Sequence, residues 1–501
     1  MAHSPFPTLT ADEAAALIPD GALVGFSGFT PAGSAKAVPR ALAARARAAH
    51  ARGEPFRIRV LAGASTGRAL DETLAEADAV AWRAPYQSSP ALRAQVNAGH
   101  VAFVDMHLSS VPQMVAAGEF GPLDVAVVEA TEVTADGRVY LTTSIGASPT
   151  WLACARRVVL EVNRRHAPRL RELHDVVVLP PPHHRHPIPI EAPLSRIGWP
   201  YAAVDPRRVV GVVETDEPDG VAAFDAPDAV SERIADHVVR FLLGEMRAGR
   251  IPREFLPVQA GVGNVANAVL RGLGGHADVP PFFMYSEVLQ DAVLDLLDEG
   301  KIVGASTTAL TLTDAAQRRV AEGIERYAPR IVMRPQEVSN HPEVIRRLGL
   351  ISLNAALEVD LYGHVNSTHV GGTHVVNGIG GSGDFARNAA VPIFVAPSTA
   401  KGGRISTVVP MCSHVDHNEH STRVIVTEHG LADLRGLAPA ERAATIVTRC
   451  AHPAYRDYLL RYLERCRPGH LRHDLRTCFE LHLNLAATGE MLPGLVVPDA
   501  R

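Results

Sequence analysis

Residues 258–273, VQAGVGNVANAVLRGL, and the segment PFFMYSEV at 281–288 decide the fold of this chain. They combine a glycine turn, a helical pattern of apolar residues, and an apolar run typical of a buried strand. The same order occurs earlier, where LVGFSGFTPAGSAKAVPRAL at 23–42 precedes FRIRVLAGASTG at 56–67. Repetition at this long spacing predicts two related α/β halves, because solenoid repeats recur every ~20–50 residues.

A second pair of segments supports the internal repeat. VVEATEVTADGRVYLTTSIGAS at 127–148 and AALEVDLYGHVNSTHVGGTHVVNG at 355–378 both place an x-Gly-x-Val turn between two apolar runs. The stretch at 214–228 is acidic, contains proline and lacks periodicity, so we expect the boundary there, between α/β domains at 1–220 and 221–501. Alternation with helical patterns predicts largely parallel sheets. Strands are expected at 56–63, 123–130, 175–180, 208–214, 302–307, 351–359 and 391–397.

The composition is that of an ordinary globular protein. The chain has 501 residues, 47% of them hydrophobic, and a formal net charge of −5, which argues against a nucleic-acid or anionic-membrane partner. The N-terminus lacks the basic and apolar regions of a secretory signal, and Thr10 with Glu13 predicts a capped helix. The chain contains no run of 18 uncharged apolar residues, and its five cysteines are scattered without C-x-x-C spacing. We therefore expect a cytoplasmic location.

Glu287 ends the apolar run PFFMYSEV and has two interpretations. Ser286 and Glu287 could cap a following helix, in which case their role is structural. The first copy of the repeat, however, has small residues at the corresponding place, in LAGASTG at 61–67. A cap needs no such divergence, so we interpret Glu287 as a reactive group in the second half.

Three glycine-containing stretches are candidate binding loops. AGVGNVANAVL at 260–270 could hold an anion at a helix N-terminus, although by itself the pattern is weak and also fits a tight strand–helix turn. HVVNGIGGSGDFARN at 374–388 could form a nest of amides or a flexible hairpin. APSTAKGGRISTVVP at 396–410 carries Lys401 and Arg404 beside two glycines, which suits a phosphate or a solvated loop.

Other chemistries have weaker support in the sequence. The histidines of PPPHHRHPIPIEAP at 180–193 lie in a proline-rich loop, where ligand geometry would be ill defined. The cluster in MCSHVDHNEHS at 411–421 matches neither H-E-x-x-H nor a zinc finger, so we expect no metal. GFSGF at 25–29 and GGSGD at 380–384 do not have the G-x-S-x-G spacing of a serine hydrolase.

Taken together, the motifs resemble those of the acetyl-CoA hydrolase/transferase family, a branch of the class I CoA-transferases that includes succinyl-CoA:acetate CoA-transferase. The resemblance extends from residue 25 to about residue 460. It is carried by GFSGFTPAGSAKAVPRAL, AGVGNVANAV, YSEVLQD, EVSNHPE, ALEVDLYGHVNST, NGIGGSGDF, STAKGGRIS and VDHNEHSTRVIVTEHGLADLRG.

The resemblance implies a homodimer of CoA-transferase-type α/β subunits that acts on acyl-CoA and short-chain carboxylates, with the catalytic glutamate and the CoA-binding loops in the second domain. The family's catalytic glutamate falls on Glu287. The resemblance places Asn340 at the thioester and Glu428 near the active site. The expected coenzyme A contacts are Gly261, Val262, Gly263, Asn264, Val265, Leu357, Asn377, Gly381 and Lys401.

The chemistry of a carboxylate agrees with this implication. A glutamate can attack a thioester, accept CoA as a glutamyl-CoA thioester, and pass it to a second carboxylate without ATP. The expected activity is therefore acyl-CoA:carboxylate CoA transfer through Glu287, with succinate and acetate as the acids that the resemblance suggests. Three alternatives stay open: an acetyl-CoA hydrolase using the same glutamate, a non-catalytic acyl-CoA-binding regulator, and a metal hydrolase built on the second histidine cluster.

Overall fold

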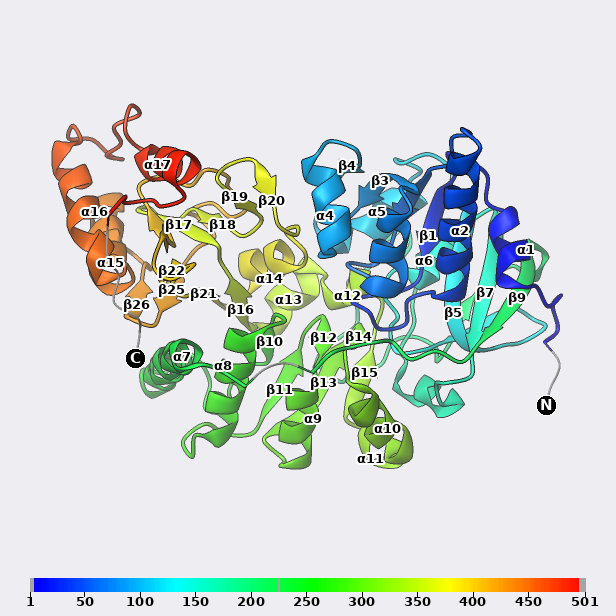
Figure 1. The fold of residues 1–501 in the computed structure, drawn as a ribbon. Coiled ribbons are helices and arrows are strands. Elements are labelled where there is room, and N and C mark those ends of the chain that lie inside the picture. Colours follow the sequence, from blue (N-terminus) through cyan, green and yellow to red (C-terminus); the bar gives the residue numbers. More distant parts are fainter. Residues whose placement is uncertain (1–3, 224–225, 495–501) are drawn as a thin grey trace. The chain divides into compact units, whose positions relative to one another are not determined.

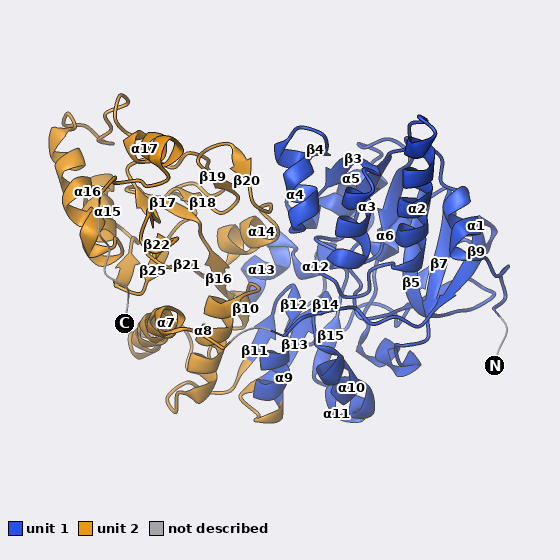
Figure 2. Cartoon of the chain, viewed as in Figure 1, with its two compact units in different colours: residues 1–223, 283–297, 303–348 blue, residues 224–282, 298–302, 349–501 orange. Residues whose placement is uncertain are grey.

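The computed structural model describes residues 4–223 and 226–494 and shows a mixed α/β protein with mostly parallel sheets (Figure 1). The chain divides into two compact units (Figure 2). Unit 1 contains residues 1–223, 283–297 and 303–348, whereas unit 2 contains residues 224–282, 298–302 and 349–501. No helix in the described part of the chain is both long enough and apolar enough to span a bilayer.

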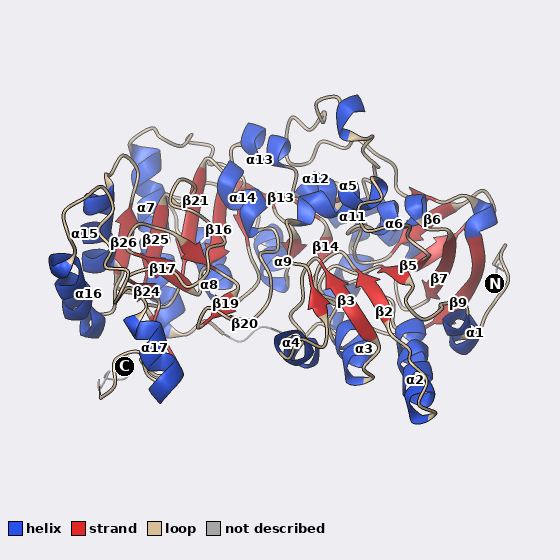
Figure 3. Cartoon of the chain, turned by 90° about the horizontal axis from the view of Figure 1, so that it is seen from above, coloured by secondary structure: helices blue, strands red, loops and turns tan. Residues whose placement is uncertain are grey.

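The N-terminal part of unit 1 is built on a sheet with the parallel order β4-β3-β2-β1-β5-β7-β9, to which β6 and β8 add antiparallel pairs. Helices α2 and α3 lie on one face of this sheet and α5 and α6 on the other (Figure 3). The strands are β1 Leu23–Phe26, β2 Ile58–Leu61, β3 Val80–Ala84, β4 Ala102–Phe103, β5 Val125–Val133, β6 Arg138–Leu141, β7 Arg157–Asn163, β8 Ala202–Ala203 and β9 Val209–Thr215. The helices are α1 Ala11–Ala16, α2 Ala37–Ala51, α3 Thr73–Glu76, α4 Pro90–Asn97, α5 Val111–Ala116 and α6 Ser148–Cys154.

Unit 1 also contains most of the segment from β11 to α13. Strands β11, β13 and β15 are neighbours in that order, and β12 forms a short parallel pair with β14. The strands are β11 Phe282–Tyr285, β12 Val288–Leu289, β13 Ile302–Thr307, β14 Ala309–Leu310 and β15 Ile331–Met333. The helices are α9 Asp291–Asp298, α10 Asp314–Glu322, α11 Ile324–Tyr327, α12 Gln336–Ser339 and α13 Pro342–Leu348.

Unit 2 has the strand order β10-β16-β21-β25-β26, parallel except for the last pair. These strands are β10 Val258–Ala260, β16 Ile351–Ala355, β21 Val391–Val395, β25 Val424–Thr427 and β26 Gly430–Asp433. Short strands add β17 Glu358–Asp360, β18 Val365–Asn366, β19 His369–Val370, β20 His374–Val375, β22 Thr399–Ala400, β23 Ile405–Ser406 and β24 Val408–Val409. The helices are α7 Ala229–Arg247, α8 Asn264–Gly275, α14 Ser382–Asn388, α15 Pro439–Arg449, α16 Pro453–Arg465 and α17 Glu480–Thr488.

The internal repeat predicted from the sequence is visible in the order of elements. The series β1, α2, β2 corresponds to β10, α8, β11, and the antiparallel pair β5–β6 corresponds to β17–β18. The two x-Gly-x-Val turns share a backbone requirement, since Gly137 has φ of 84° and Gly363 has φ of 93°. Glycine adopts these positive φ values without steric cost, which explains why both copies have it.

Two local predictions can be compared directly with the structure. The capped helix at the N-terminus is confirmed, because Thr10 and Glu13 form a capping box at α1. The strand expected at 175–180 is wrong: the segment is extended, with isolated bridges at His174 and Val176. The Asp175 carboxylate binds the amides of Ile197 and Gly198, and the prolines from 180 onward have no N–H to continue a ladder.

The compact units differ from a simple division into halves. The chain passes from unit 1 to unit 2 at residue 223, close to the expected boundary, but residues 283–297 and 303–348 group with unit 1. Glu287 and Asn340 therefore lie in the same compact unit as the N-terminal sheet. The division into domains at 1–220 and 221–501 describes the duplicated sequence and stays a prediction.

Candidate active site

Glu287 lies in unit 1 at the carboxyl end of β11, immediately before β12. Its backbone carbonyl accepts hydrogen bonds from the amides of Thr308 and Ala309, at 2.9 and 3.1 Å, and from the Thr307 hydroxyl at 2.8 Å. The following helix, α9, begins only at Asp291, so the capping interpretation of Glu287 is wrong. The backbone is fixed from three sides while the side chain is half-buried.

Asn340 holds the Glu287 carboxylate. It is the fully buried residue at the end of α12, and its side-chain amide donates a hydrogen bond to Glu287 Oε1. The Ser339 hydroxyl donates to Asn340 Oδ1 at 2.8 Å, which assigns the amide nitrogen to the side facing the glutamate. A neutral donor orients a carboxylate without neutralising its charge, so this arrangement suits a nucleophile. The structure thus brings together two of the residues predicted from the sequence.

An apolar cluster adjoins this pair within unit 1. Val288 and Ala309 pack with Phe29, Ala32, Ala64 and Leu108, and Tyr86 lies against the cluster. Phe29 and Ala32 come from the first glycine turn, for which the sequence predicted no role in the site. The sequence gives no separate signal for them, because apolar residues beside a glycine turn have the same pattern as ordinary core residues.

The glycine turn of unit 2 lies at the carboxyl end of β10 and leads directly into α8. Gly263 has φ of 134°, a conformation that favours glycine, and Val262 is 50% exposed. Gly261, Asn264 and Val265 are partly exposed. The first N–H groups of a helix have no partner within it, so this turn can accept an anion or a carbonyl oxygen.

The second glycine loop of unit 2 surrounds the start of α14. Gly381 is the residue before this helix, and Gly380 has φ of 56°. The Ser382 hydroxyl donates to Ile379 O at 2.7 Å and lies 3.1 Å from His417 Nε2, which holds the loop in shape. Asn377, also partly exposed, precedes this loop.

The remaining predicted residues of unit 2 follow its other parallel strands. Leu357, 37% exposed, comes after β16. Lys401 is exposed in the turn between β22 and β23, beyond β21. Glu428 follows β25 and accepts hydrogen bonds from the Ser398 amide and hydroxyl, at 2.8 and 2.5 Å. With the glycine turn after β10, candidates therefore follow four neighbouring parallel strands, where α/β sheets commonly bind ligands.

Unit 1 contains a second group of ionisable residues that the sequence analysis missed. The buried Lys36 ammonium lies 2.5 Å from Glu129 and 3.1 Å from Asp219. His166 Nε2 lies 3.4 and 3.5 Å from the same two carboxylates. Burial alone would lower the pKa of His166, but Asp219 and Glu129 outweigh it and raise that pKa to about 9. Two cations thus balance two carboxylates.

This cluster bears on the expectation of a metal. Within the described ranges, the only group of histidine and carboxylate side chains that gathers like a metal ligand set is Glu129, His166 and Asp219. The Lys36 ammonium already contacts both carboxylates, so the group is internally balanced. Neither histidine cluster considered from the sequence forms such a set among the described residues.

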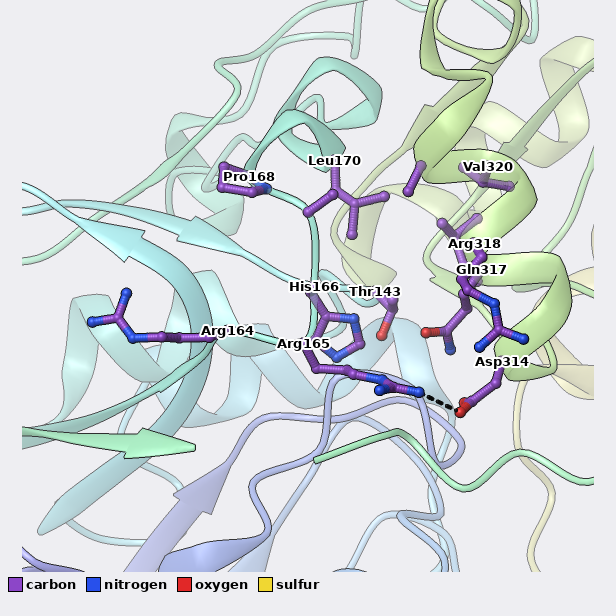
Figure 4. A pocket seen from close by; sticks show the side chains of 13 residues that line it. Thr143, Arg164, Arg165, His166, Pro168, Leu170, Asp314, Gln317, Arg318 and Val320 are labelled. Atoms are coloured by element: carbon purple, nitrogen blue, oxygen red, sulfur yellow. Dashed lines mark hydrogen bonds and ion pairs between the residues drawn. The ribbon is translucent and has the colours of Figure 1, made fainter. Parts of the chain in front are cut away.

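A pocket of about 200 Å³ opens beside His166 and Gln317 (Figure 4). Arg165 forms an ion pair with Asp314 at its rim, at 3.0 Å, and Arg164 pairs with Glu214 at 2.5 Å. Gln317 donates to Asp219 at 3.0 Å and so connects the pocket to the buried charges. None of the site residues predicted from the sequence lines this pocket.

The fold and the candidate residues define an α/β protein with a fixed, half-buried carboxylate and glycine turns at the ends of parallel strands. The chain belongs to the acetyl-CoA hydrolase/transferase family. Residues 3–214 match the model of the family's N-terminal domain and residues 317–463 match that of its C-terminal domain. The resemblance stated from the motifs is confirmed.

Curated relatives resemble the chain over nearly its whole length. It is 56% identical over 484 residues to propanoyl-CoA:succinate CoA transferase of Escherichia coli, covering 97% of this chain and 98% of the relative. It is 41% identical to succinyl-CoA:acetate CoA-transferase of Clostridium kluyveri, covering 96% and 90%. It is 40% identical to acetyl-CoA hydrolase of Schizosaccharomyces pombe, covering 94% and 93%. The relatives are enzymes, and so is this chain.

Solved structures confirm the fold. RipA from Yersinia pestis superposes with a TM-score of 0.69 at 25% identity, covering 91% of this chain and 96% of that one. A 4-hydroxybutyrate CoA-transferase from Porphyromonas gingivalis superposes with a TM-score of 0.61 at 23% identity, covering 92% and 97%. The predicted fold class, α/β of the CoA-transferase type with largely parallel sheets, is therefore confirmed.

Proposed function

We propose that this chain is an acyl-CoA:carboxylate CoA-transferase that works through a glutamyl-CoA thioester on Glu287. The observation that carries the proposal is the hydrogen bond from the buried Asn340 amide to the Glu287 carboxylate. The 56% identical relative transfers CoA between propanoyl-CoA and succinate, which favours short acids such as propionate, succinate and acetate as substrates.

The proposed reaction proceeds in balanced steps. A Glu287 oxygen attacks the thioester carbonyl, and the CoA thiolate leaves, giving a mixed anhydride. The thiolate attacks the glutamyl carbonyl, the product carboxylate leaves, and glutamyl-CoA remains. An incoming carboxylate then reverses both steps and carries CoA away. Asn340 can donate to the oxyanion that forms on the glutamyl carbon, a type of contact that commonly contributes 10²–10³ in rate.

Coenzyme A is proposed as the substrate carrier bound by unit 2. The amides at the start of α8 and α14 are suited to its carbonyl and phosphate oxygens, and exposed Lys401 to a phosphate. Within this proposal Glu428 supports the reacting groups. The contacts with coenzyme A are Gly261 to Val265, Leu357, Asn377, Gly381 and Lys401. We also propose a cytoplasmic homodimer, which light scattering after size-exclusion chromatography and cell fractionation would test.

Trapping the intermediate tests the covalent route. Given acyl-CoA without acceptor acid, the enzyme should stop as glutamyl-CoA, which borohydride reduces and hydroxylamine converts to a hydroxamate. Peptide mapping should find the modification within residues 282–291, and Glu287→Gln, the matched control, should remain unmodified. Modification of a serine or cysteine instead would contradict the proposal.

A net hydrolase is the second candidate, and the 40% identical acetyl-CoA hydrolase favours it. Both activities share the nucleophile and differ only in whether water reaches the intermediate. Acyl-CoA donors measured against a panel of carboxylates, with free CoA release followed in parallel, would separate them. Thioester loss at the same rate with and without an acceptor would establish the hydrolase. A regulator that does not catalyse would show neither reaction.

A further inference from the structure

The proline- and histidine-rich segment at 180–196, which we call the strap, has no assigned role. It has almost no regular structure, only a turn of 3₁₀ helix at Pro182–His184. It is nevertheless fastened to unit 1 at several points, among them α12, α13 and Arg334, which follows β15. These elements lead up to Asn340 and continue beyond it, so the attachments bear on the candidate active site.

The first attachment joins the strap to α12. The Arg185 guanidinium forms an ion pair with Glu337 Oε1, and the two side chains are only 18% and 6% exposed. Arg185 Nε also donates to Pro180 O at 2.8 Å, which fixes the guanidinium within the strap. Burial raises the pKa of Glu337, and the neighbouring Arg185 charge opposes that rise. Removing Arg185 would therefore take away the positive charge that offsets the burial of the Glu337 carboxyl group.

Further attachments hold the rest of the strap in place. Arg347 of α13 donates to the carbonyls of Ile188 and Ile190, at 2.6 and 2.5 Å. The buried Arg334, after β15, donates to the carbonyls of Pro193 and Ser195, at 3.0 and 2.5 Å. The strap is therefore a fixed part of unit 1, able to hold Arg185 in position.

Helix α12 depends on such external contacts. It spans Gln336–Ser339, a single turn, and one turn of helix has little stability of its own. The Gln336 amide donates to Gly146 O at 2.9 Å, and the Tyr285 hydroxyl donates to Val338 O at 2.9 Å. Glu337 adds the ionic contact, and Asn340 ends the turn with its amide on Glu287.

We propose that Arg185 is a positioning residue: its ion pair with Glu337 fixes α12 and thereby the hydrogen bond from Asn340 to Glu287. This inference rests on the proposed role of Glu287. It assigns the role of the strap to Arg185. His183, His184 and His186 are exposed, and we expect them to make no contribution to the position of α12.

A double-mutant cycle tests the coupling. We expect Arg185→Ala to lower kcat for acyl-CoA turnover about tenfold with little change in KM, because the substrate contacts remain. Asn340→Ala should lower kcat by about 10²–10³. If Arg185 acts through Asn340, the double variant should be no slower than Asn340→Ala alone. If the two single losses of kcat multiply in the double variant, the inference is overturned.

Two controls separate positioning from folding. The triple variant His183→Ala, His184→Ala, His186→Ala changes the same strap without touching the ion pair, and should keep wild-type kcat and melting temperature. Arg185→Lys should recover only part of the rate, since lysine cannot donate to both Glu337 and Pro180 in a fixed geometry. Full recovery, or an equal loss in the triple variant, would contradict the specific role of Arg185.

Outcomes for the inference and for the proposed function remain distinguishable. If Arg185→Ala does not fold, Glu337→Gln provides the same cycle with Asn340→Ala, because it removes the buried charge while keeping the side-chain shape. An active Glu287→Gln enzyme would disprove the glutamate mechanism. An inactive Glu287→Gln enzyme together with additive effects of Arg185 and Asn340 would disprove the positioning role alone.

Discussion

The two copies of the glycine turn–helix–strand repeat have the same order of elements but differ in what lies at the N-terminus of the helix. In the first copy, the N-terminus of α2 is closed by a residue of the protein itself. The buried Glu161 carboxylate accepts hydrogen bonds from the amides of Lys36, Ala37 and Val38, at 2.8, 3.2 and 2.8 Å. The N-terminus of α2 is therefore stabilised by a carboxylate of the protein itself.

In the second copy, the corresponding helix α8 begins at a partly exposed turn. Val262 is 50% exposed, and Gly263 takes a backbone conformation that keeps the turn free of side-chain bulk. The following strand, β11, leads to Glu287, whereas β2 in the first copy leads to small residues. Duplication therefore supplies one copy whose helix N-terminus is closed by a buried carboxylate and one whose helix begins at a partly exposed turn.

Two lysines of the chain, one in the first copy and one in a later loop of the second half, differ in a similar way. Burial alone would lower the pKa of Lys36, but Glu129 and Asp219 outweigh it and raise that pKa above its usual range. Lys401 of the second half is exposed instead. A buried charge with ionic partners serves stability, whereas an exposed one can bind a ligand.

The largest expected effect comes from changing Glu287, at the end of the strand in the second copy. Glu287→Gln keeps the shape of the side chain but removes the nucleophile, so we expect turnover to fall by more than about 10²-fold. Circular dichroism and the melting temperature should stay near those of the wild type. A folded variant with more than about 1% of wild-type activity would show that Glu287 is not the nucleophile.

The next effect breaks the first copy. Lys36→Met removes the ammonium and leaves Glu129 and Asp219 buried with less positive charge, which should lower the free energy of unfolding by about 3–5 kcal/mol. Urea unfolding measures this loss. The exposed pair Arg207–Asp205 provides the control, and Arg207→Met should leave stability close to that of the wild type. Equal effects would mean that the buried cluster is not structural.

A third, smaller effect depends on pH. The pKa of His166 is about 9 in the folded protein, above its usual 6.5, so its stabilising contribution is complete below about pH 6.5. It is lost as pH rises through 9, amounting to roughly 3 kcal/mol. The stability difference between wild type and His166→Gln should therefore shrink between pH 6 and pH 9.5. A constant difference would indicate that folding leaves the pKa of His166 unshifted.

The smallest expected effect concerns Lys401 in the second half and the KM for acyl-CoA. Lys401→Ala should raise KM for acyl-CoA roughly two- to tenfold, because an exposed lysine–phosphate contact is weak and is equal in ground and transition states. Arg423→Ala, which removes another cation of the same unit, should leave KM unchanged. If kcat falls while KM stays constant, Lys401 belongs at the reacting groups instead.

The sequence by itself determined the α/β class, the internal repeat and the family. Each rests on local information: apolar periodicity, glycines at positive φ such as Gly137 and Gly363, and ordered motifs. It also singled out Glu287 and Asn340 as candidates, through the resemblance and the unusual end of the strand, and the structure joins them by a hydrogen bond. It failed at 175–180, where a side chain and prolines outweighed the β-branched pattern.

Only the tertiary structure decided which groups meet. Lys36, Glu129, His166 and Asp219 are far apart in the chain and form no motif, yet the fold gathers them into one balanced cluster. The partner of Arg185 is 152 residues away. Pairings of this kind depend on the three-dimensional path of the backbone and on burial, which strengthens ionic contacts. Neither the backbone path nor the burial of a side chain can be read directly from a single sequence.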